Sequence, residues 1–360
     1  MSAITQLDIT AIRNIQHGRL GCHPRLNLVF GVNGSGKTSV LEAIYLLSRG
    51  RSFRTSQTDT LIDRDSNEAV VFAQLSDHKL GLSRARNKKP SLRLDEIQQD
   101  NWDRVARILP VLVIDSGTFA LLEGGPRARR QFLDWGVFHV EQSFIASWRN
   151  FRKSLANRNQ LLKSRSVDHD SLRAWNQEFV LHGEAVDRAR ESYYKQFQSV
   201  LLPVYRELAG EEIELTMEYS RGWWSDCSLS QALDKAVESD LRYKATQVGP
   251  QRADILLKVQ GKAAQDVLSR GQQKILVCAL KIAQGVFHSQ LSDNKSIYLL
   301  DDLPAELDAS NRSAVLQRVL QTGSQVFVTC VEREALVKSL PGGEEMTAFH
   351  VERGKIVTVN

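Results

Sequence analysis

The sequence predicts an α/β fold in which one head is assembled from the N- and C-terminal parts of the chain, with a mainly helical lobe inserted between them. Short apolar strands alternate with amphipathic helices in residues 1–115, and this alternation returns from about residue 246. Residues 116–210 contain instead two long, almost glycine-free stretches with helical periodicity. We therefore expect residues 1–115 and 246–360 to form the head and residues 116–245 to form the lobe.

Composition is that of a globular chain. The 360 residues suffice for two or three domains, and 42% apolar with 25% charged residues excludes disorder of the whole chain. No apolar run approaches the ~20 residues that span a bilayer, and the start has no secretory pattern, so we expect no membrane partner. The four scattered cysteines favour reduced thiols and a cytoplasmic location over zinc or disulfides. The net charge of +5 permits a polyanionic partner without requiring one.

Local periodicity predicts the elements of the N-terminal part. Leu26, Leu28 and Phe30 alternate as in a half-buried strand. Apolar residues then recur at helical spacing over residues 40–47, and Gly50 is expected to end that helix. Further strands are expected at residues 70–75, 80–82, 92–94 and 111–114.

The lobe and the C-terminal part follow from the same patterns. Two long helices are expected at residues 143–163 and 172–208, and Pro203 is expected to kink or interrupt the second because proline lacks a backbone donor. An apolar face of that second helix is expected to contain Trp175, Phe179, Leu181, Val186, Tyr193 and Phe197. The remaining elements are a strand at 213–219, a helix at 272–288, buried strands at 297–300 and 326–328, and a final hairpin around 352–355.

A glycine-rich segment between the first predicted strand and helix carries the clearest functional signal. Residues 31–38 match GxxxxGK[ST], the P-loop pattern, in which backbone N–H groups and the helix start face phosphate oxygens. Lys37 can reach the β- and γ-phosphates as a catalytic cation, and the Thr38 hydroxyl can ligate Mg²⁺. The expected nucleotide-binding residues are Gly31, Val32, Asn33, Gly34, Ser35, Gly36, Lys37 and Thr38.

A second carboxylate site follows the predicted strand at residues 297–300. Asp301 is expected to hold Mg²⁺, and Asp302 is expected to orient or activate the attacking water as a catalytic residue. Strands also end in Asp for turn or capping reasons, so the assignment depends on the P-loop. Lys37 and Asp301 are 264 positions apart, which indicates a large insertion between the two halves of the site.

The segment at residues 268–274, Leu-Ser-Arg-Gly-Gln-Gln-Lys, has two interpretations. Ser269 and Gln272 have the spacing of a capping box. The segment also matches the signature motif of ABC-type ATPases, with Arg270 at the third position. In that case Ser269, Arg270, Gly271 and Gln272 would contact the γ-phosphate of ATP held by another protomer. Residues 306–308 resemble the D-loop of the same class.

Longer segments make the resemblance specific. The chain resembles the RecF family of ABC-type, SMC-like ATPases over essentially its whole length, most specifically in Gly-Gly-Pro-Arg-Ala-Arg-Arg-Gln-Phe-Leu-Asp-Trp at 124–135 and in Leu-Ser-Arg-Gly-Gln. The resemblance implies ATP and Mg²⁺ as cofactors, a homodimer formed on ATP binding that clamps duplex DNA, and slow, DNA-stimulated hydrolysis that releases it. It also implies work at single-strand gaps and single-strand/double-strand junctions, where the protein acts with RecO and RecR to help RecA onto DNA.

The chain departs from related ATPases at two places. A transporter ATPase has a switch histidine after the strand at 326–328, where this chain has Thr329, Cys330, Val331 and Glu332. The family's usual Gly-Pro-His-Arg-Asp-Asp is here Gly-Pro-Gln-Arg-Ala-Asp at 249–254, so phosphate sensing by that histidine is in doubt. The region of the Q-loop is expected near residues 114–116.

Two further groups of residues have open interpretations. Arg13 and Asn14 stand where SMC-like ATPases contact the nucleotide, and a surface turn explains them equally well. Residues 127–173 contain ten Lys or Arg against four acidic residues, which indicates either a solvated helix face or contacts with DNA phosphates. Residues 84–89 form a second basic segment. The DNA-binding candidates are Arg127, Arg129, Arg130, Arg149, Arg152 and Lys153.

Three other function classes fit less well. A P-loop metabolic kinase does not need the Leu-Ser-Arg-Gly-Gln segment, and a transporter cassette would not separate its two phosphate motifs by 264 residues. An SMC-like structural ATPase needs long arms with sustained heptads, which are absent from this sequence. An ATP-dependent DNA-binding protein of recombinational repair and replication restart is therefore the leading hypothesis.

Overall fold

The computed structural model describes residues 3–164, 166, 168–210 and 214–359 of the chain. It divides into two compact units. Unit 1 comprises Met1–Phe119, Glu207–Gly210 and Arg270–Asn360, and unit 2 comprises Ala120–Arg206 and Glu211–Ser269. Residues 246–269, which the sequence pattern assigned to the head, group with unit 2 because strand β10 (Asp254–Val259) pairs there with β9 (Leu215–Ser220). Arg165 and Ile213, part of the expected basic cluster and strand, lie outside the described residues.

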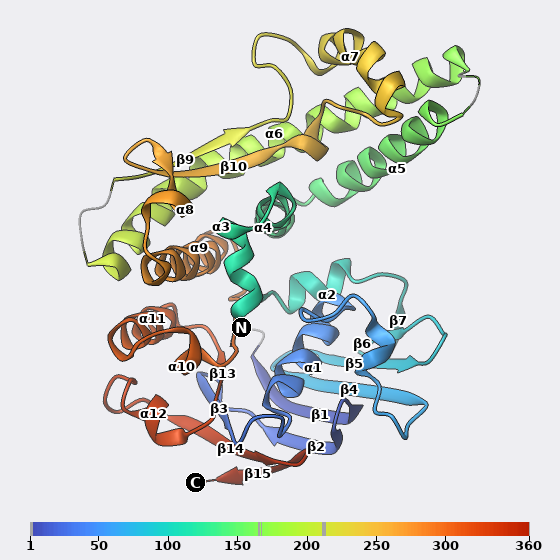
Figure 1. Cartoon of the computed structure of the whole chain (residues 1–360). Helices are drawn as coiled ribbons and strands as arrows, with labels where there is room; N and C mark the ends of the chain where they lie inside the picture. Colours follow the sequence, from blue (N-terminus) through green and yellow to red (C-terminus); the bar gives the residue numbers. More distant parts are fainter. Residues whose placement is uncertain (1–2, 165, 167, 211–213, 360) are drawn as a thin grey trace. The chain divides into compact units, whose positions relative to one another are not determined.

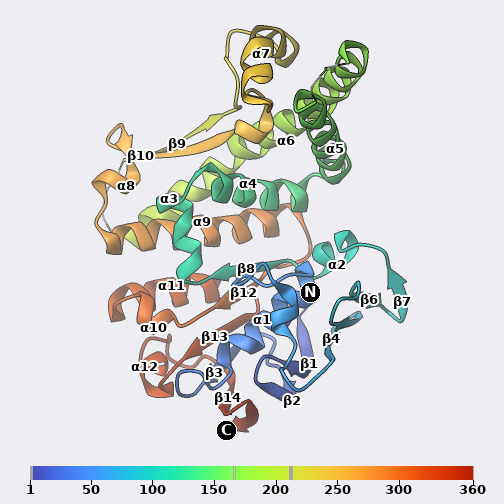
Figure 2. The same cartoon turned by 45° about the vertical axis from the view of Figure 1, so that its right-hand side comes forward.

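Unit 1 contains a six-stranded sheet in the order β15-β14-β3-β13-β12-β8. Figure 1 labels β15, β14, β3 and β13, and Figure 2 labels β12 and β8. All neighbouring strands are parallel except β15, which forms a hairpin with β14. The segments that follow β3, β12 and β13 therefore meet at one edge, the usual ligand edge of such sheets. The strand bounds are β3 Leu26–Phe30, β8 Val111–Ile114, β12 Ile297–Leu300, β13 Val326–Cys330, β14 Met346–Glu352 and β15 Lys355–Val359.

A second, antiparallel sheet of unit 1 has the order β2-β1-β4-β5-β6-β7. Its apolar face shares one hydrophobic core with helix α1 (Lys37–Arg49) and with Val111, Leu299 and Phe327 of the parallel sheet. Burial of α1 on both sides fixes the helix that begins inside the P-loop. The bounds are β1 Ile4–Ile12, β2 Ile15–Gly21, β4 Glu68–Leu75, β5 Lys79–Ala85, β6 Ser91–Leu94 and β7 Ile97–Gln99.

The other helices of unit 1 are mostly short. The helix expected at residues 272–288 is confirmed and lies within α9, most of whose residues from Ile275 on are buried. Gly50 ends α1 as expected, in a left-handed conformation with φ of 67°. The bounds are η1 Thr58–Leu61, α2 Asp103–Ile108, η2 Ser116–Phe119, α9 Arg270–Leu291, α10 Leu303–Glu306, α11 Ala309–Gln321 and α12 Arg333–Val337.

Unit 2 combines long helices with a three-stranded sheet, β11-β10-β9. In Figures 1 and 2 strands β9 and β10 run along the 41-residue helix α6, and the Tyr194 hydroxyl of α6 donates to the carbonyl of Met217 in β9. The bounds are α3 Ala120–Glu123, α4 Pro126–Val140, α5 Phe144–Leu162, α6 His169–Ala209, α7 Leu229–Tyr243, η3 Pro250–Arg252, β11 Lys262–Ala263 and α8 Ala264–Val267.

Two expectations about α6 are corrected by the structure. The helix is not interrupted at Pro203, where only one backbone donor is lost and the nearby Leu201 and Val204 are buried, whereas a kink there remains a prediction. Leu181 is 61% exposed, whereas Phe179, Val186 and Phe197 are buried as expected. Among the described residues, no helix has the length and apolar character needed to cross a membrane.

Candidate nucleotide-binding site

The segment between β3 and α1 folds tightly, as the P-loop pattern predicts. Gly31, Gly34 and Gly36 all have positive φ, at 149°, 77° and 120°. A Cβ on Gly31 would lie 2.2 Å from the carbonyl oxygen of Val351 in β14, so only glycine fits there. The Lys37 Nζ donates to the carbonyls of Gly31 at 2.8 Å and Val32 at 3.0 Å. The lysine therefore lies across the loop, on the side where phosphates would be bound.

The P-loop also contains an unsatisfied polar atom. The Ser35 side chain is buried, and its Oγ has no hydrogen-bond partner among the described residues. A buried hydroxyl without a partner costs free energy that a bound polar ligand can recover. Together with the glycine-lined loop and Lys37, this hydroxyl fits a triphosphate.

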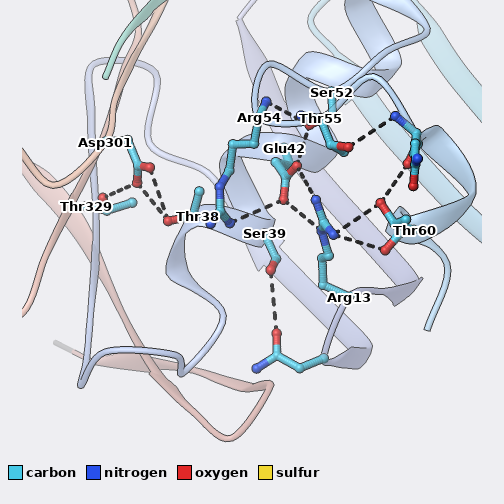
Figure 3. A network of polar contacts seen from close by, with 12 residues as sticks. Arg13, Thr38, Ser39, Glu42, Ser52, Arg54, Thr55, Thr60, Asp301 and Thr329 are labelled. Atoms are coloured by element: carbon cyan, nitrogen blue, oxygen red, sulfur yellow. Dashed lines mark hydrogen bonds and ion pairs between the residues drawn. The ribbon is translucent and has the colours of Figure 1, made fainter. Parts of the chain in front are cut away.

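Thr38 and Asp301 are brought together across most of the chain (Figure 3). The Thr38 Oγ1 donates to Asp301 Oδ1 at 2.9 Å and lies 3.2 Å from Oδ2, while Thr329 Oγ1 donates to Oδ1 at 2.8 Å. Burial raises the pKa of Asp301, and the hydrogen bonds from Thr329 and Thr38 oppose that rise. A hydroxyl beside a carboxylate is an oxygen donor set that Mg²⁺ accepts, so these residues fit the ion.

Asp302 follows Asp301 in an unusual backbone conformation. Its φ of 48° and ψ of 44° are left-handed, which is uncommon for a residue other than glycine. Its N–H donates to Thr329 Oγ1 at 2.7 Å. Thr329 lies in the segment where a transporter ATPase has its switch histidine. The sequence did not predict that its hydroxyl contacts the Asp301 carboxylate and the Asp302 N–H.

Arg13 and Asn14 both support the P-loop segment. The Asn14 Nδ2 donates to the carbonyls of Gly34 at 3.1 Å and Ser35 at 2.9 Å. Arg13 is paired with the buried Glu42 of α1 at 3.0 Å (Figure 3). Both residues lie in the turn between β1 and β2, and Asn14 is exposed, so the surface turn is confirmed. The contacts above give that turn a supporting role, and a direct contact with nucleotide remains a prediction.

Two functional positions near the loop were missed by sequence reasoning. Gly354, in the hairpin between β14 and β15, donates its N–H to the carbonyl of Ser35 at 2.8 Å. A Cβ there would lie 1.9 Å from the carbonyl oxygen of Asn14, so the hairpin needs glycine to approach the P-loop. Arg54, 3.8 Å from Glu42, is half exposed, and its charge opposes the rise in the pKa of Asp301. The sequence predicted the hairpin around residues 352–355, but neither its contact with the P-loop nor the pairing of Arg54 with Glu42.

Along the chain, the boundary between unit 2 and unit 1 falls within the signature segment, between Ser269 and Arg270. Ser269, Arg270 and Gly271 are exposed at the start of α9, and their contact with a second protomer remains a prediction. Four residues into α9, the Lys274 Nζ pairs with Glu306 at 3.0 Å and also donates to its carbonyl at 2.7 Å. Glu306, the first residue of the expected D-loop, is thus paired with a cation.

The six DNA-binding candidates separate into two groups. Arg129 pairs with Asp254 at 2.7 Å and donates to two carbonyls, and Arg130 donates to the carbonyl of Ala253 at 2.7 Å. These two side chains stabilise unit 2 by joining α4 to the start of β10 and the residue before it. The exposed candidates are Arg127, Arg149, Arg152 and Lys153.

The second basic segment, residues 84–89, also contains both paired and exposed cations. The expected Q-loop region lies at the nucleotide edge. Arg84 pairs with Asp59, and Arg86 donates to the carbonyl of Asp63, whereas Lys88 and Lys89 are exposed. Asp115, directly after β8, is close enough to Asp301 to raise its pKa.

Comparison with known proteins agrees with this geometry. The family model "RecF/RecN/SMC N terminal domain" matches residues 3–356. The DNA replication and repair protein RecF of Pseudomonas entomophila (strain L48) is 41% identical over 362 residues, with 98% of each chain covered. The protein of the same name from Shewanella baltica (strain OS155 / ATCC BAA-1091) is 41% identical over 361 residues, with 99% of each chain covered.

Solved structures show the same fold. One of the recombination mediator protein RecF with ATP, in the RecFOR pathway, has a TM-score of 0.88 at 22% identity and covers 99% of this chain and 98% of that chain. The Smc head domain of Pyrococcus furiosus bound to the C-terminal domain of ScpA has a TM-score of 0.59 at 13% identity. The match covers 100% of this chain and 97% of that chain. The chain therefore belongs to the RecF family of DNA replication and repair proteins, within the wider group of RecF, RecN and SMC N-terminal domains.

Proposed function

We propose that this protein is an ATP-dependent DNA-binding protein of recombinational repair and replication restart, in which ATP controls a DNA-clamping homodimer. The observation that carries the proposal is the contact between Thr38 and Asp301. These residues are 263 positions apart, yet their side chains lie 2.9 Å apart beside the P-loop. A Mg²⁺–ATP site requires such a hydroxyl and such a carboxylate together beside the P-loop.

Each residue of the site has a role in the proposal. The P-loop amides and Lys37 hold the triphosphate, and Arg13 and Asn14 keep the loop in place. Thr38 and Asp301 hold Mg²⁺, which would neutralise charge on the β- and γ-phosphates. Asp302 orients or activates the attacking water. The hydrolysis is weak and serves as a switch that ends the ATP-bound state. The solved RecF with ATP supports this nucleotide, because its fold matches at a TM-score of 0.88.

Dimerisation and DNA binding complete the proposal. The exposed start of α9 binds the γ-phosphate held by a second copy of the chain, giving two ATP molecules per dimer. The exposed cations of unit 2 contact phosphates of duplex DNA and of single-strand/double-strand junctions. RecR, with RecO, is the expected protein partner for helping RecA onto DNA, as the pathway of the solved RecF suggests. A chromosomal DNA partner agrees with a cytoplasmic location.

Sedimentation tests this function directly. The wild-type chain should sediment as a monomer with ADP and as a dimer with ATP and Mg²⁺, and duplex DNA should stabilise the dimer. The variant Ser269→Arg should bind ATP as the monomer but fail to dimerise, because a guanidinium would occupy the place of the γ-phosphate. A variant dimer of wild-type stability would reject the signature-motif assignment. A wild-type chain that binds no ATP would reject the function as a whole.

A further inference from the structure

Thr329 carries the only hydroxyl of β13, and that hydroxyl makes two hydrogen bonds. It is completely buried, and its single hydroxyl donates to Asp301 Oδ1 at 2.8 Å while accepting the Asp302 N–H at 2.7 Å. A threonine hydroxyl has one donor and two acceptor sites, so the donor is committed to the carboxylate. The same atom therefore contacts both members of the acidic pair.

The parallel sheet places this hydroxyl opposite the carboxylate. Leu300 of β12 is in register with Val328 of β13, so the residues that follow, Asp301 and Thr329, face each other at the end of β12. Thr38 approaches the same carboxylate at 2.9 Å from the start of α1 (Figure 3). Asp301 is thus held by the P-loop helix on one side and by β13 on the other.

The second hydrogen bond acts on the backbone of Asp302. That residue is left-handed, with φ of 48° and ψ of 44°, and such a conformation persists in a non-glycine residue only when its surroundings enforce it. Thr329 holds its N–H, and the N–H of Ala305 donates to its carbonyl at 2.9 Å. The direction in which the Asp302 side chain leaves the backbone depends on these two contacts.

We propose that Thr329 is a positioning residue of the ATP site, whose one hydroxyl orients the carboxylate of Asp301 and fixes the backbone from which Asp302 projects. This inference rests on the proposed function, because it assigns to Asp301 the metal and to Asp302 the water. It predicts that loss of the hydroxyl impairs Mg²⁺-dependent nucleotide binding and turnover together, through two residues that keep their own side chains.

Three variants isolate the hydroxyl. Thr329→Val keeps the shape and removes both hydrogen bonds, whereas Thr329→Ser keeps the hydroxyl and loses only a methyl group. Thr347→Val, in β14 of the same sheet, is the control, because no hydrogen bond of its hydroxyl is found within the described residues. Thr329→Ala replaces Thr329→Val if the valine variant does not fold, as judged by circular dichroism and melting temperature.

Calorimetry of ATP binding, with Mg²⁺ and with EDTA, gives a readout that does not depend on hydrolysis. Thr329→Val should bind ATP like wild type in EDTA and should lose the extra affinity that Mg²⁺ confers, by about 10-fold or more. Turnover should fall by about 10- to 100-fold, and Thr329→Ser should recover both properties.

The possible outcomes separate this inference from the function on which it rests. Wild-type Mg²⁺ dependence and turnover in Thr329→Val, or equal losses in Thr329→Ser, would overturn the positioning role while leaving the ATP site intact. If the wild-type chain binds Mg²⁺–ATP without measurable turnover, the Mg²⁺ dependence alone decides. A wild-type chain with no ATP affinity would overturn both the function and this role.

Discussion

The polar side chains of the nucleotide edge in unit 1 and the buried arginines of unit 2 are satisfied to different degrees. At the nucleotide edge, Ser35 has no partner among the described residues and Lys37 rests on two backbone carbonyls. In unit 2, Arg158 uses all three guanidinium nitrogens, on Asn176, Thr246 and Asp240. The polar groups of the nucleotide edge can still bind a ligand, whereas the guanidinium of Arg158 is fully used by hydrogen bonds and an ion pair within unit 2.

The free energy of burial explains this difference. Arg158 and Asp240 are 1% and 0% exposed, and a buried charge is tolerated only when paired and hydrogen-bonded. The P-loop lies at a strand end, where solvent or a ligand can satisfy polar groups. Substitutions in the first region should therefore change function without changing stability, and substitutions in the second should do the reverse.

The largest expected effect is on the stability of unit 2. Arg158→Met leaves Asp240 buried without its cation, and we expect the free energy of unfolding to fall by about 3–5 kcal/mol with ATP affinity unchanged. Urea unfolding of the full chain measures this. The control Lys153→Met, exposed on the same helix α5, should stay within about 0.5 kcal/mol of wild type. Equal losses in both variants would break the comparison.

The next effect is on turnover at the nucleotide edge. Asp302→Asn keeps the size of the side chain but cannot accept a proton from water, so turnover should fall by about 100-fold or more. ATP affinity and melting temperature should be those of wild type, and the ATP-bound dimer should persist longer. Single-turnover phosphate release is the measurement. An unchanged rate would move the catalytic carboxylate to another residue, with Glu306 first in line despite its pairing to Lys274.

A somewhat smaller effect is expected on ATP affinity itself. Lys37→Met removes the cation that faces the phosphates, and loss of a charged hydrogen bond should weaken ATP binding by about 10- to 150-fold. The fold should be unaffected, because the Lys37 Nζ donates to carbonyls of its own loop and holds no other segment in place. Calorimetry compares it with Lys355→Met in the exposed hairpin. Equal affinities for the two variants would contradict the P-loop assignment.

The smallest expected effect is on the salt dependence of DNA binding, and it compares exposed with paired cations of unit 2. Duplex binding should depend strongly on salt, and replacing Arg149, Arg152 and Lys153 by Ala should flatten the log–log slope by up to ~0.9 per lost phosphate contact. Arg129→Ala should instead destabilise unit 2 and leave the slope unchanged, because its guanidinium is bound to Asp254. Fluorescence anisotropy between low and moderate salt tests both. A wild-type slope in the triple variant would place the DNA path elsewhere, first at Lys88 and Lys89.

Local patterns predicted most elements correctly. The strand at Leu26–Phe30, the helix after it and the buried strands at 111–114 and 297–300 were confirmed, because their apolar spacing reflects burial directly. An interruption at Pro203 and the burial of Leu181 were predicted wrongly, since burial of nearby residues keeps α6 continuous and a periodic pattern does not say how wide the covered face is. The boundary at 246 was missed because strand pairing with β9 is not a local property.

The sequence by itself determined the chemistry of the P-loop and of the acidic pair, because glycine, lysine, threonine and aspartate have the same functional groups in any fold. Tertiary structure alone decided which of those groups meet. The hydrogen bond of Gly354 to Ser35, the contact of Thr329 with both aspartates and the pairing of Arg129 with Asp254 each join residues distant in the sequence. A charged or hydroxyl side chain acquires its role from the partner that folding brings within about 3 Å, and that partner is not encoded in neighbouring residues.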